Sequence, residues 1–206
     1  YDRNGTKVYL GEWASKGNNV SNALVEAAYL TNVERNADVV VMSSYAPLLA
    51  KEGHTNWNPD LIYFNNTEIK PTANYYVQRA FGQNGGDEYV ASDITVDYSA
   101  TGNNKPLIGD IANRIDKSVV VDSKTGDVIV KIVSMLPKEA VVTVNLGEEL
   151  VKHNISGKAQ LSLLAAPQQP DRSRAWAVNE ASRIDVSKEF NVTLPAYSFA
   201  VVRISK

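Results

Sequence analysis

The sequence predicts an α/β segment followed by an all-β segment that folds as an antiparallel β-sandwich. Up to the glycine pair at 85–86, short β-branched runs alternate with stretches of helical periodicity. Beyond that pair, strand patterns follow one another and are separated only by turn residues. We therefore expect two domains, residues 1–84 and residues 85–206, and the second has a common size for one domain.

The first segment predicts two strand–helix units. Residues 7–10 indicate a strand, and residues 20–35 indicate a helix that Asn19 or Ser21 could cap. The apolar face of this helix follows the i, i+3, i+4, i+7 spacing at Leu24, Ala27, Ala28 and Thr31. Residues 38–44, DVVVMSS, form a nearly continuous apolar run, which is typical of a parallel strand covered on both faces.

The chain then predicts a loop, a short strand and a second helix. The loop contains Pro47, Gly53 and HTNWNPD, and the strand is LIYF at 61–64. The helix, 72–81, begins after Pro71 and ends at GQNGG.

The second segment predicts strands with period-two or β-branched patterns, and SKTGD at 123–127 predicts a hairpin turn between two of them. Residues 168–180 are polar and irregular, which favours a loop on the edge of the sandwich. The runs that indicate strands are ITVDYS, SVVVDSKTGDVIVKIVSML, AVVTVNL, AQLSLLAA, FNVTL and YSFAVVRI.

Two strand–helix units cannot close a core, because each parallel strand needs neighbours at both edges and helices over both faces. We therefore expect the first segment to be the last two β/α units of an incomplete TIM-type barrel, within the carboxy-terminal part of a longer protein. An incomplete barrel leaves a bare strand edge and exposed apolar surface. Self-association is the expected consequence.

Glu12 stands where the first strand ends, in KVYLGEWAS. In β/α barrels the active site lies at the carboxyl ends of the strands, so we expect Glu12 on a strand parallel to the run at 39–42, with its side chain toward the barrel axis. Trp13 offers an apolar wall and a donor N–H, both suited to a sugar. The alternative for Glu12 is an exposed or arginine-paired residue without catalytic function.

Four blocks in order, VYLGEWAS, ALVEAAYLTNVERNADVVVMSSYAPLLA, WNPDLIYFNN and PTANYYVQRAF, resemble the end of the catalytic barrel of α-L-arabinofuranosidases of glycoside hydrolase family 51. The resemblance covers most of the first 82 residues, and the sandwich matches in architecture and closing strand. It implies that Glu12 is the nucleophile and Trp13 the aromatic residue that follows it. The general acid/base of the family falls upstream of Tyr1.

The resemblance implies retaining hydrolysis of terminal α-L-arabinofuranosyl residues in arabinan or arabinoxylan oligosaccharides or polysaccharides, with no cofactor. The chain alone is expected to be inactive, because the acid/base is not within it. An extracellular or periplasmic location is favoured for the parent protein. The alternatives are a retaining glycosidase of other specificity, such as a xylosidase, and a carbohydrate-binding or structural sandwich module. A binding module would show a row of exposed aromatics, for which the strands offer Tyr89, Tyr98 and Phe190.

Other polar and aromatic residues carry weaker hypotheses. Trp57 and Asn58 could line a sugar pocket, or serve as a loop anchor and a pre-proline turn residue. Tyr45 could face the same pocket, although core packing is favoured. Glu26 and Glu34 lie within the first helix, where a solvated or locally paired carboxylate is expected, and neither is assigned a catalytic role.

Composition excludes several classes of partner and site. A net charge of −2 provides no basic field for nucleic acid or for a membrane surface. The absence of cysteine excludes disulfides, thiolate metal sites and cysteine nucleophiles. His54 and His153 are too far apart in the sequence to suggest a metal site, and no metal is expected.

Overall fold

The structure is a computed structural model that describes residues 2–95, 114–147, 157–165 and 177–206. The helices are α1 (Val20–Arg35) and α2 (Ala73–Gln83). The first strands are β1 (Val8–Trp13), β2 (Val40–Tyr45), β3 (Leu49–Lys51), β4 (Ile62–Phe64), β5 (Ile69–Pro71) and β6 (Glu88–Tyr89). The later strands are β7 (Ile115–Asp122), β8 (Asp127–Ser134), β9 (Ala140–Asn145), β10 (Lys158–Ala165), β11 (Ala177–Asp185), β12 (Glu189–Leu194) and β13 (Ser198–Ile204).

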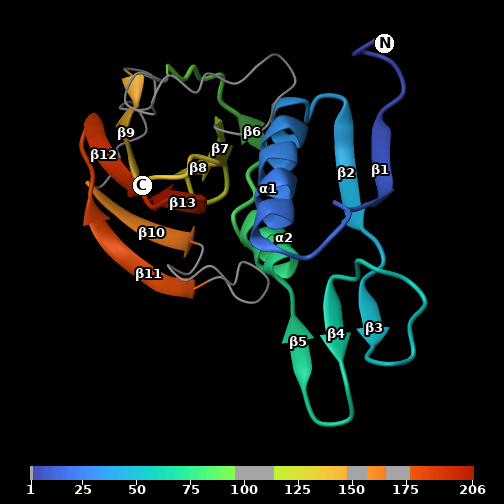
Figure 1. Cartoon of the computed structure of the whole chain (residues 1–206). Coiled ribbons are helices and arrows are strands. Elements are labelled where there is room, and N and C mark those ends of the chain that lie inside the picture. The colour runs from blue at the N-terminus through green and yellow to red at the C-terminus, as the bar shows by residue number, and fades with distance from the viewer. Residues whose placement is uncertain (1, 96–113, 148–156, 166–176) are drawn as a thin grey trace.

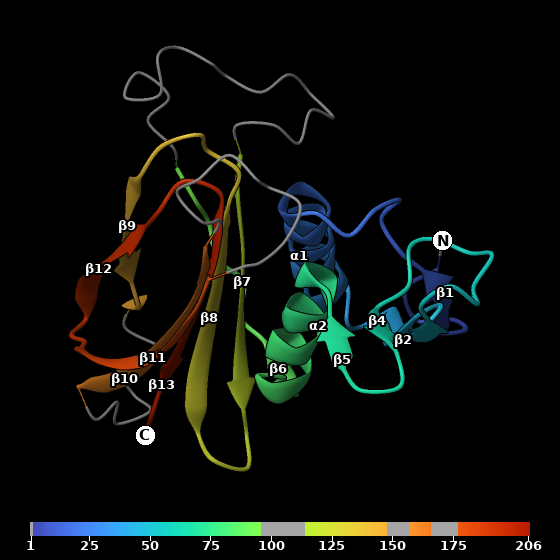
Figure 2. The ribbon, with the colours of Figure 1, turned by 60° about the horizontal axis from the view of Figure 1, so that its bottom comes forward.

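The predicted antiparallel sandwich is confirmed, and helices cover one of its outer faces (Figures 1 and 2). A large sheet of order β11-β10-β13-β8-β7-β6 lies in the middle. The β12–β9 pair packs on one face of this sheet, and α1 and α2 pack on the other. The result is three layers with an apolar core on each side of the large sheet.

The central strands β8 and β13 are buried on both faces, which explains their unbroken apolar runs. Successive side chains of a strand point to opposite faces, so each strand serves both cores. In β8, Val128, Val130 and Ile132 belong to the core shared with β9 and β12, whereas Ile129 and Val133 belong to the core under the helices. Phe199 of β13 also faces the helices and stacks on Phe81 of α2.

The turn chemistry of the sandwich was partly predictable. The hairpin at 123–127 joins β7 to β8, and its Gly126 adopts a φ of 78°, which an L side chain rarely takes. The predicted edge loop at 168–180 is wrong in its last four residues, which form the start of β11. The rest of that loop lies outside the described residues.

The expected parallel pairing is confirmed, since β1 pairs with β2 from Val8↔Val40 to Trp13↔Tyr45. The expectation that the 38–44 run is covered on both faces is wrong here, because Val41 and Met42 are more than half exposed. The described part of this sheet has only two strands, and the described residues leave these two side chains uncovered. The three-stranded sheet β3-β4-β5 was not predicted.

A buried ion pair joins α1 to the large sheet. Lys131 of β8 is fully buried, and its ammonium lies 2.7 Å from Oε1 of Glu34. The hydroxyl of Ser118 donates to the other carboxylate oxygen of Glu34, and the Phe81 ring lies 5.2 Å from the ammonium. Burial lowers the pKa of Lys131, and the Glu34 carboxylate opposes that shift. Glu34 is thus paired with the sandwich rather than with a neighbour on its own helix.

We expect Glu34→Gln to destabilise the chain by about 3 to 5 kcal/mol, because it leaves the Lys131 ammonium buried without its charge partner. Lys131→Met should cost less, since Glu34 is partly exposed and its carboxylate can regain water. The matched control is Glu52→Gln, which breaks an exposed pair with Lys70 and should cost less than about 1 kcal/mol. Urea denaturation measures all three, and equal losses for the two glutamate variants would contradict this interpretation.

Candidate active site

A hollow of about 940 Å³ opens at the carboxyl ends of β1 and β2. Because these strands are parallel, their carboxyl ends lie together, and the segments that follow them form the walls. The hollow is lined by Glu12, Trp13, Ala14, Lys16, Gly17, Ala46, Pro47, Trp57, Asn58 and Pro59. All four residues singled out from the sequence as site candidates are therefore brought to one place.

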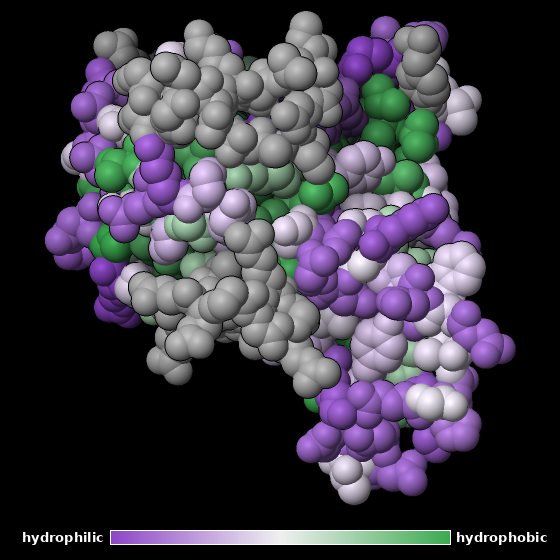
Figure 3. Space-filling model, viewed as in Figure 1, coloured by the Kyte–Doolittle hydropathy of each residue, from purple (hydrophilic) through white to green (hydrophobic). Residues whose placement is uncertain are grey.

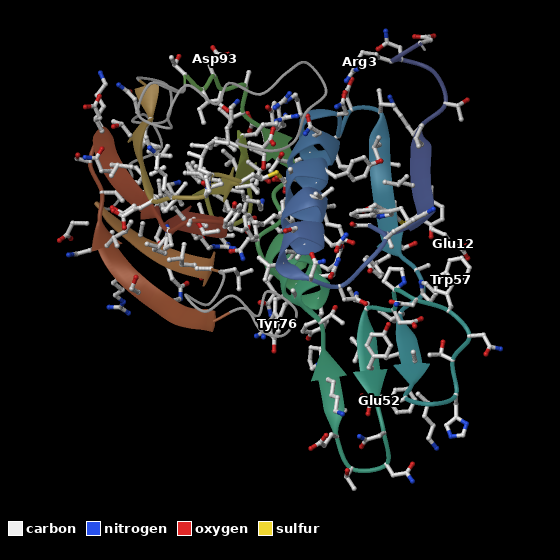
Figure 4. The ribbon with its side chains drawn as sticks, in the orientation of Figure 1. Arg3, Glu12, Glu52, Trp57, Tyr76 and Asp93 are labelled. Carbon is white, nitrogen blue, oxygen red and sulfur yellow. The ribbon has the colours of Figure 1, made fainter. Side chains whose placement is uncertain are left out.

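Glu12 is exposed at the end of β1, on the side of the hollow where Trp57 also lies (Figure 4). Among the described residues, its carboxylate has no hydrogen-bond or ion-pair partner. Of the alternative, the arginine pairing finds no support in the described part of the chain, whereas an exposed glutamate is what the structure shows. A carboxylate without a partner in an open hollow is available to react with, or bind, a molecule there.

Trp13 contributes an aromatic wall, but its indole N–H does not face the hollow. The ring packs 5.0 Å from Tyr29 of α1 and 6.1 Å from Tyr45, measured between ring centroids. Its Nε1 is buried and has no hydrogen-bond partner among the described residues. In this position the N–H is closed to a sugar hydroxyl, so the described residues do not support the expected bond.

Trp57 and Asn58 lie on the segment between β3 and β4. Trp57 is 62% exposed and borders the hollow, so its exposure gives the alternative of a loop anchor little support. The Asn58 Oδ1 lies 3.3 Å from the Tyr63 hydroxyl, which places the amide at the rim. Tyr45 is not among the residues that line the hollow, and its ring packs against that of Trp13.

The turn between β1 and α1 is held by a set of side chains on the helix. Asn19 caps α1 by accepting from the Asn22 N–H at 3.0 Å, as predicted. Gly17 has a φ of 147°, and a Cβ there would lie 2.5 Å from Asn22 Oδ1, so only glycine fits without a shift. The Asn22 side-chain amide also donates to the Ser15 hydroxyl at 2.6 Å.

Glu26 contradicts the expectation of a solvated face, since only 1% of it is exposed. Its Oε1 accepts the backbone N–H of Ser15 at 2.9 Å, and its Oε2 accepts from Gln78 Nε2 at 3.4 Å. Burial raises the pKa of the Glu26 carboxyl to about 7, against the opposing effect of these hydrogen bonds. The signal was present in the sequence, because Glu26 stands at i+3 from Ala23 and i−4 from Leu30, on the apolar face.

Asparagine side chains connect the turn after β1 to the segment that carries Asn58. The Asn18 side-chain amide donates to the Asp60 carbonyl at 3.1 Å and lies 3.4 Å from Asn74 Oδ1. Asn74 is fully buried and its amide reaches the Gly17 carbonyl. The Tyr63 hydroxyl accepts the Asp60 N–H and lies within 3.4 Å of Asn18 Oδ1. Sequence analysis missed this network because no local motif marks it.

Other classes of site find little in the described residues. No group of three or more His, Asp or Glu side chains is clustered there in a way that could hold a metal ion. His153 lies outside the described residues. In the same part of the chain, neither helix has both the length and the apolar character that a membrane span requires.

In the described sandwich, Phe190 is buried and Tyr89 packs under the helices, so neither belongs to an exposed aromatic row, and Tyr98 lies outside the described residues.

Residues 11–198 match the family model described as the α-L-arabinofuranosidase C-terminal domain. The chain is 51% identical over 109 residues to an extracellular exo-α-L-arabinofuranosidase of Streptomyces chartreusis, covering 53% of this chain and 13% of that protein. It is 37% identical over 97 residues to α-L-arabinofuranosidase 1 of Arabidopsis thaliana, covering 45% and 14% respectively. The matches therefore span only about one seventh of the length of these relatives.

Solved structures show the same fold. An arabinose-bound α-L-arabinofuranosidase of glycoside hydrolase family 51 superimposes with a TM-score of 0.73 at 25% identity, covering 92% of this chain and 28% of that one. The α-L-arabinofuranosidase of Thermotoga maritima, in an arabinose complex, gives a TM-score of 0.74 at 14% identity, covering 97% and 43%. The second likeness concerns the fold alone.

We expect the free energy of unfolding to fall as the pH rises from about 4.5 to about 7, relative to Glu26→Gln. The folded pKa of Glu26 is raised to about 7 from an ordinary 4.5, so the folded state keeps a proton that the unfolded state releases. This contribution is complete below the unfolded pKa and is lost as the pH passes the folded pKa. Urea denaturation of both proteins across this range measures the difference, and parallel curves would contradict it.

Proposed function

The chain belongs to the family of α-L-arabinofuranosidase C-terminal domains, and on this premise we propose that it is the carboxy-terminal part of a retaining α-L-arabinofuranosidase. Its substrates would be terminal α-L-arabinofuranosyl residues of arabinan or arabinoxylan. One observation carries the proposal: Glu12 stands exposed at the carboxyl end of β1, in a hollow that Trp57 and Asn58 also line. This is where the strand-end nucleophile of a β/α barrel belongs.

In the proposed reaction Glu12 attacks the anomeric carbon and forms a covalent arabinosyl-enzyme, which water then cleaves. The acid/base carboxyl would stand about 5 to 5.5 Å from Glu12 and would protonate the leaving oxygen. It would come from a barrel strand upstream of this chain. Trp57 offers its exposed ring to a sugar face, and Asn58 offers an amide for a hydroxyl.

The proposal includes the two domains, residues 1–84 as the end of a TIM-type barrel and residues 85–206 as the sandwich. In support, β1 and β2 are parallel, and apolar side chains around them face solvent (Figure 3). Those more than half exposed are Tyr9, Val41, Met42, Leu48, Leu49 and Trp57. Further barrel strands and helices would cover such a surface in the whole protein, and self-association would cover it in the isolated chain.

In the whole protein, Glu12→Ala should abolish arabinose release from an aryl α-L-arabinofuranoside, because the attacking carboxylate is gone. Azide should enter the vacated space, attack from the same side and give an arabinosyl azide of inverted configuration. Incubation of the whole protein with Glu12 intact and a slow fluorinated arabinofuranosyl substrate should label the peptide that contains VYLGEWAS, as mass spectrometry would show. The matched control is Glu68→Ala, which removes another exposed carboxylate and should leave turnover unchanged.

Two outcomes would overturn the assignment of Glu12: turnover that survives Glu12→Ala, or a label trapped on another carboxylate. The chain by itself should release no arabinose above background, because general acid catalysis typically contributes 10²- to 10⁴-fold and its carboxyl would lie upstream. Activity of the 206-residue chain would place both carboxyls within it.

We expect the isolated chain to self-associate through the exposed residues near β1 and β2. Sedimentation velocity over a range of concentrations should show this, and Val41→Lys should reduce it, because a charge opposes apolar association. Val141→Lys is the matched control, since Val141 on β9 is equally exposed at 60% but lies on the sandwich. A monodisperse monomer with uniform protease resistance would count against the incomplete barrel.

A further inference from the structure

The helix that follows Glu12 in the chain carries a buried carboxyl, that of Glu26. Glu12 is exposed in the hollow, whereas Glu26, on α1, is 1% exposed. The turn that leaves β1 separates them, and Ser15 of that turn lies two residues beyond the end of the strand. Nothing in the proposed chemistry uses Glu26, so its presence in the interior needs its own explanation.

The Glu26 carboxyl joins three segments of chain. It accepts the Ser15 N–H at 2.9 Å from the turn and the Gln78 Nε2 at 3.4 Å from α2, while it is itself fixed on α1. A carboxyl group has two oxygens that can each accept from a separate donor, which an alkyl side chain cannot do. The backbone at Ser15, three residues after Glu12, is therefore bonded to a side chain that contacts both helices.

Burial of the Glu26 carboxyl is unfavourable in free energy, and this argues for a functional role of the residue. Taking a carboxyl from water into the interior is unfavourable even when it is hydrogen-bonded, and burial raises the pKa of Glu26 to about 7. An apolar residue at this position of α1 would fit the pattern of its neighbours Ala23, Ala27 and Leu30. What an apolar residue could not do is hold the Ser15 N–H.

We propose that Glu26 is a positioning residue for Glu12: by binding the Ser15 N–H, it fixes the turn after β1 and with it the direction of the Glu12 side chain. The proposal rests on the proposed function, in which Glu12 attacks the anomeric carbon. A displacement of about 1 Å in a reacting group can cost on the order of 10² in rate. A carboxyl that holds the backbone three residues away from the nucleophile therefore acts on kcat.

The test compares Glu26→Met with Glu26→Gln. Methionine fills the same space but cannot accept a strong hydrogen bond, whereas glutamine keeps an oxygen for the Ser15 N–H. In the 206-residue chain, hydrogen exchange of the Ser15 amide should speed up by at least about 10-fold in Glu26→Met and stay slow in Glu26→Gln. In the whole protein, kcat should fall by about 10²-fold in Glu26→Met with little change in KM. In Glu26→Gln, kcat should stay close to that of the unsubstituted protein.

The matched control is Thr31→Val, which alters another fully buried polar side chain of α1, far along the helix from the turn. It should lower stability without changing Ser15 exchange or kcat. Should Glu26→Met fail to fold, Glu26→Asp shortens the reach by one methylene and should move both readouts in the same direction.

The outcomes separate this proposal from the function on which it rests. Unchanged Ser15 exchange in Glu26→Met, or faster exchange with kcat intact, would overturn the positioning role while Glu12 remains essential. Equal loss of kcat in Glu26→Gln, Glu26→Met and Thr31→Val would show a structural role only. Turnover that survives Glu12→Ala would overturn the function, and the exchange data would still report whether Glu26 holds the turn.

Discussion

The packing of α1 on the large sheet is the constraint on which the site depends, and the Glu34–Lys131 ion pair fixes it. Lys131 interrupts the apolar face of β8 and is fully buried, so it must meet an anion, and Glu34 on α1 supplies it. The pair ties the carboxyl-terminal part of α1 to the large sheet. The same helix carries Glu26, which holds the Ser15 N–H, and Ser15 follows the strand end that bears Glu12. One helix thus carries both the contact to the sandwich and the contact to the turn beside the hollow.

The two ends of α1 use buried polarity differently. Near its carboxyl end, the ion pair of Glu34 joins the helix to the sheet, with Ser118 as a second donor. Nearer its amino end, Glu26 and Asn22 form hydrogen bonds with Ser15 in the turn before the helix. The other buried side chains of α1 are mainly apolar, with Ala23, Leu24 and Ala27 almost fully buried. Apolar burial stabilises the packing of α1. We interpret the polar contacts as favouring one position of the helix among those that apolar burial would allow.

Much of the fold could be predicted from the sequence because its periodicity is local. The helix at 20–35, its Asn19 cap and the hairpin at 123–127 follow from neighbouring residues, and the parallel pairing of β1 with β2 follows from the order strand, helix, strand. For Glu26 the sequence favours a solvated or locally paired carboxylate, because carboxylates usually lie at the surface, although its spacing puts it on the apolar face. The burial of the Trp13 N–H could not be predicted, because the sequence does not say how the indole ring is oriented against α1. The Asn18–Asn74 and Tyr63 contacts join residues far apart in the chain, and no spacing rule predicts them.

The structure favours a supporting role for the sandwich over a sugar-binding one. A sheet that binds a polysaccharide needs an open face with aromatic rings on it. Here the β9–β12 pair covers one face of β7, β8 and β13, and the two helices cover the other. The aromatic residues of the described sandwich strands are used in these contacts, with Phe199 stacked on Phe81 and Phe190 in the opposite core. With both faces occupied, what the sheet offers to the rest of the molecule is a fixed surface for α1, and through α1 a fixed position for the end of β1.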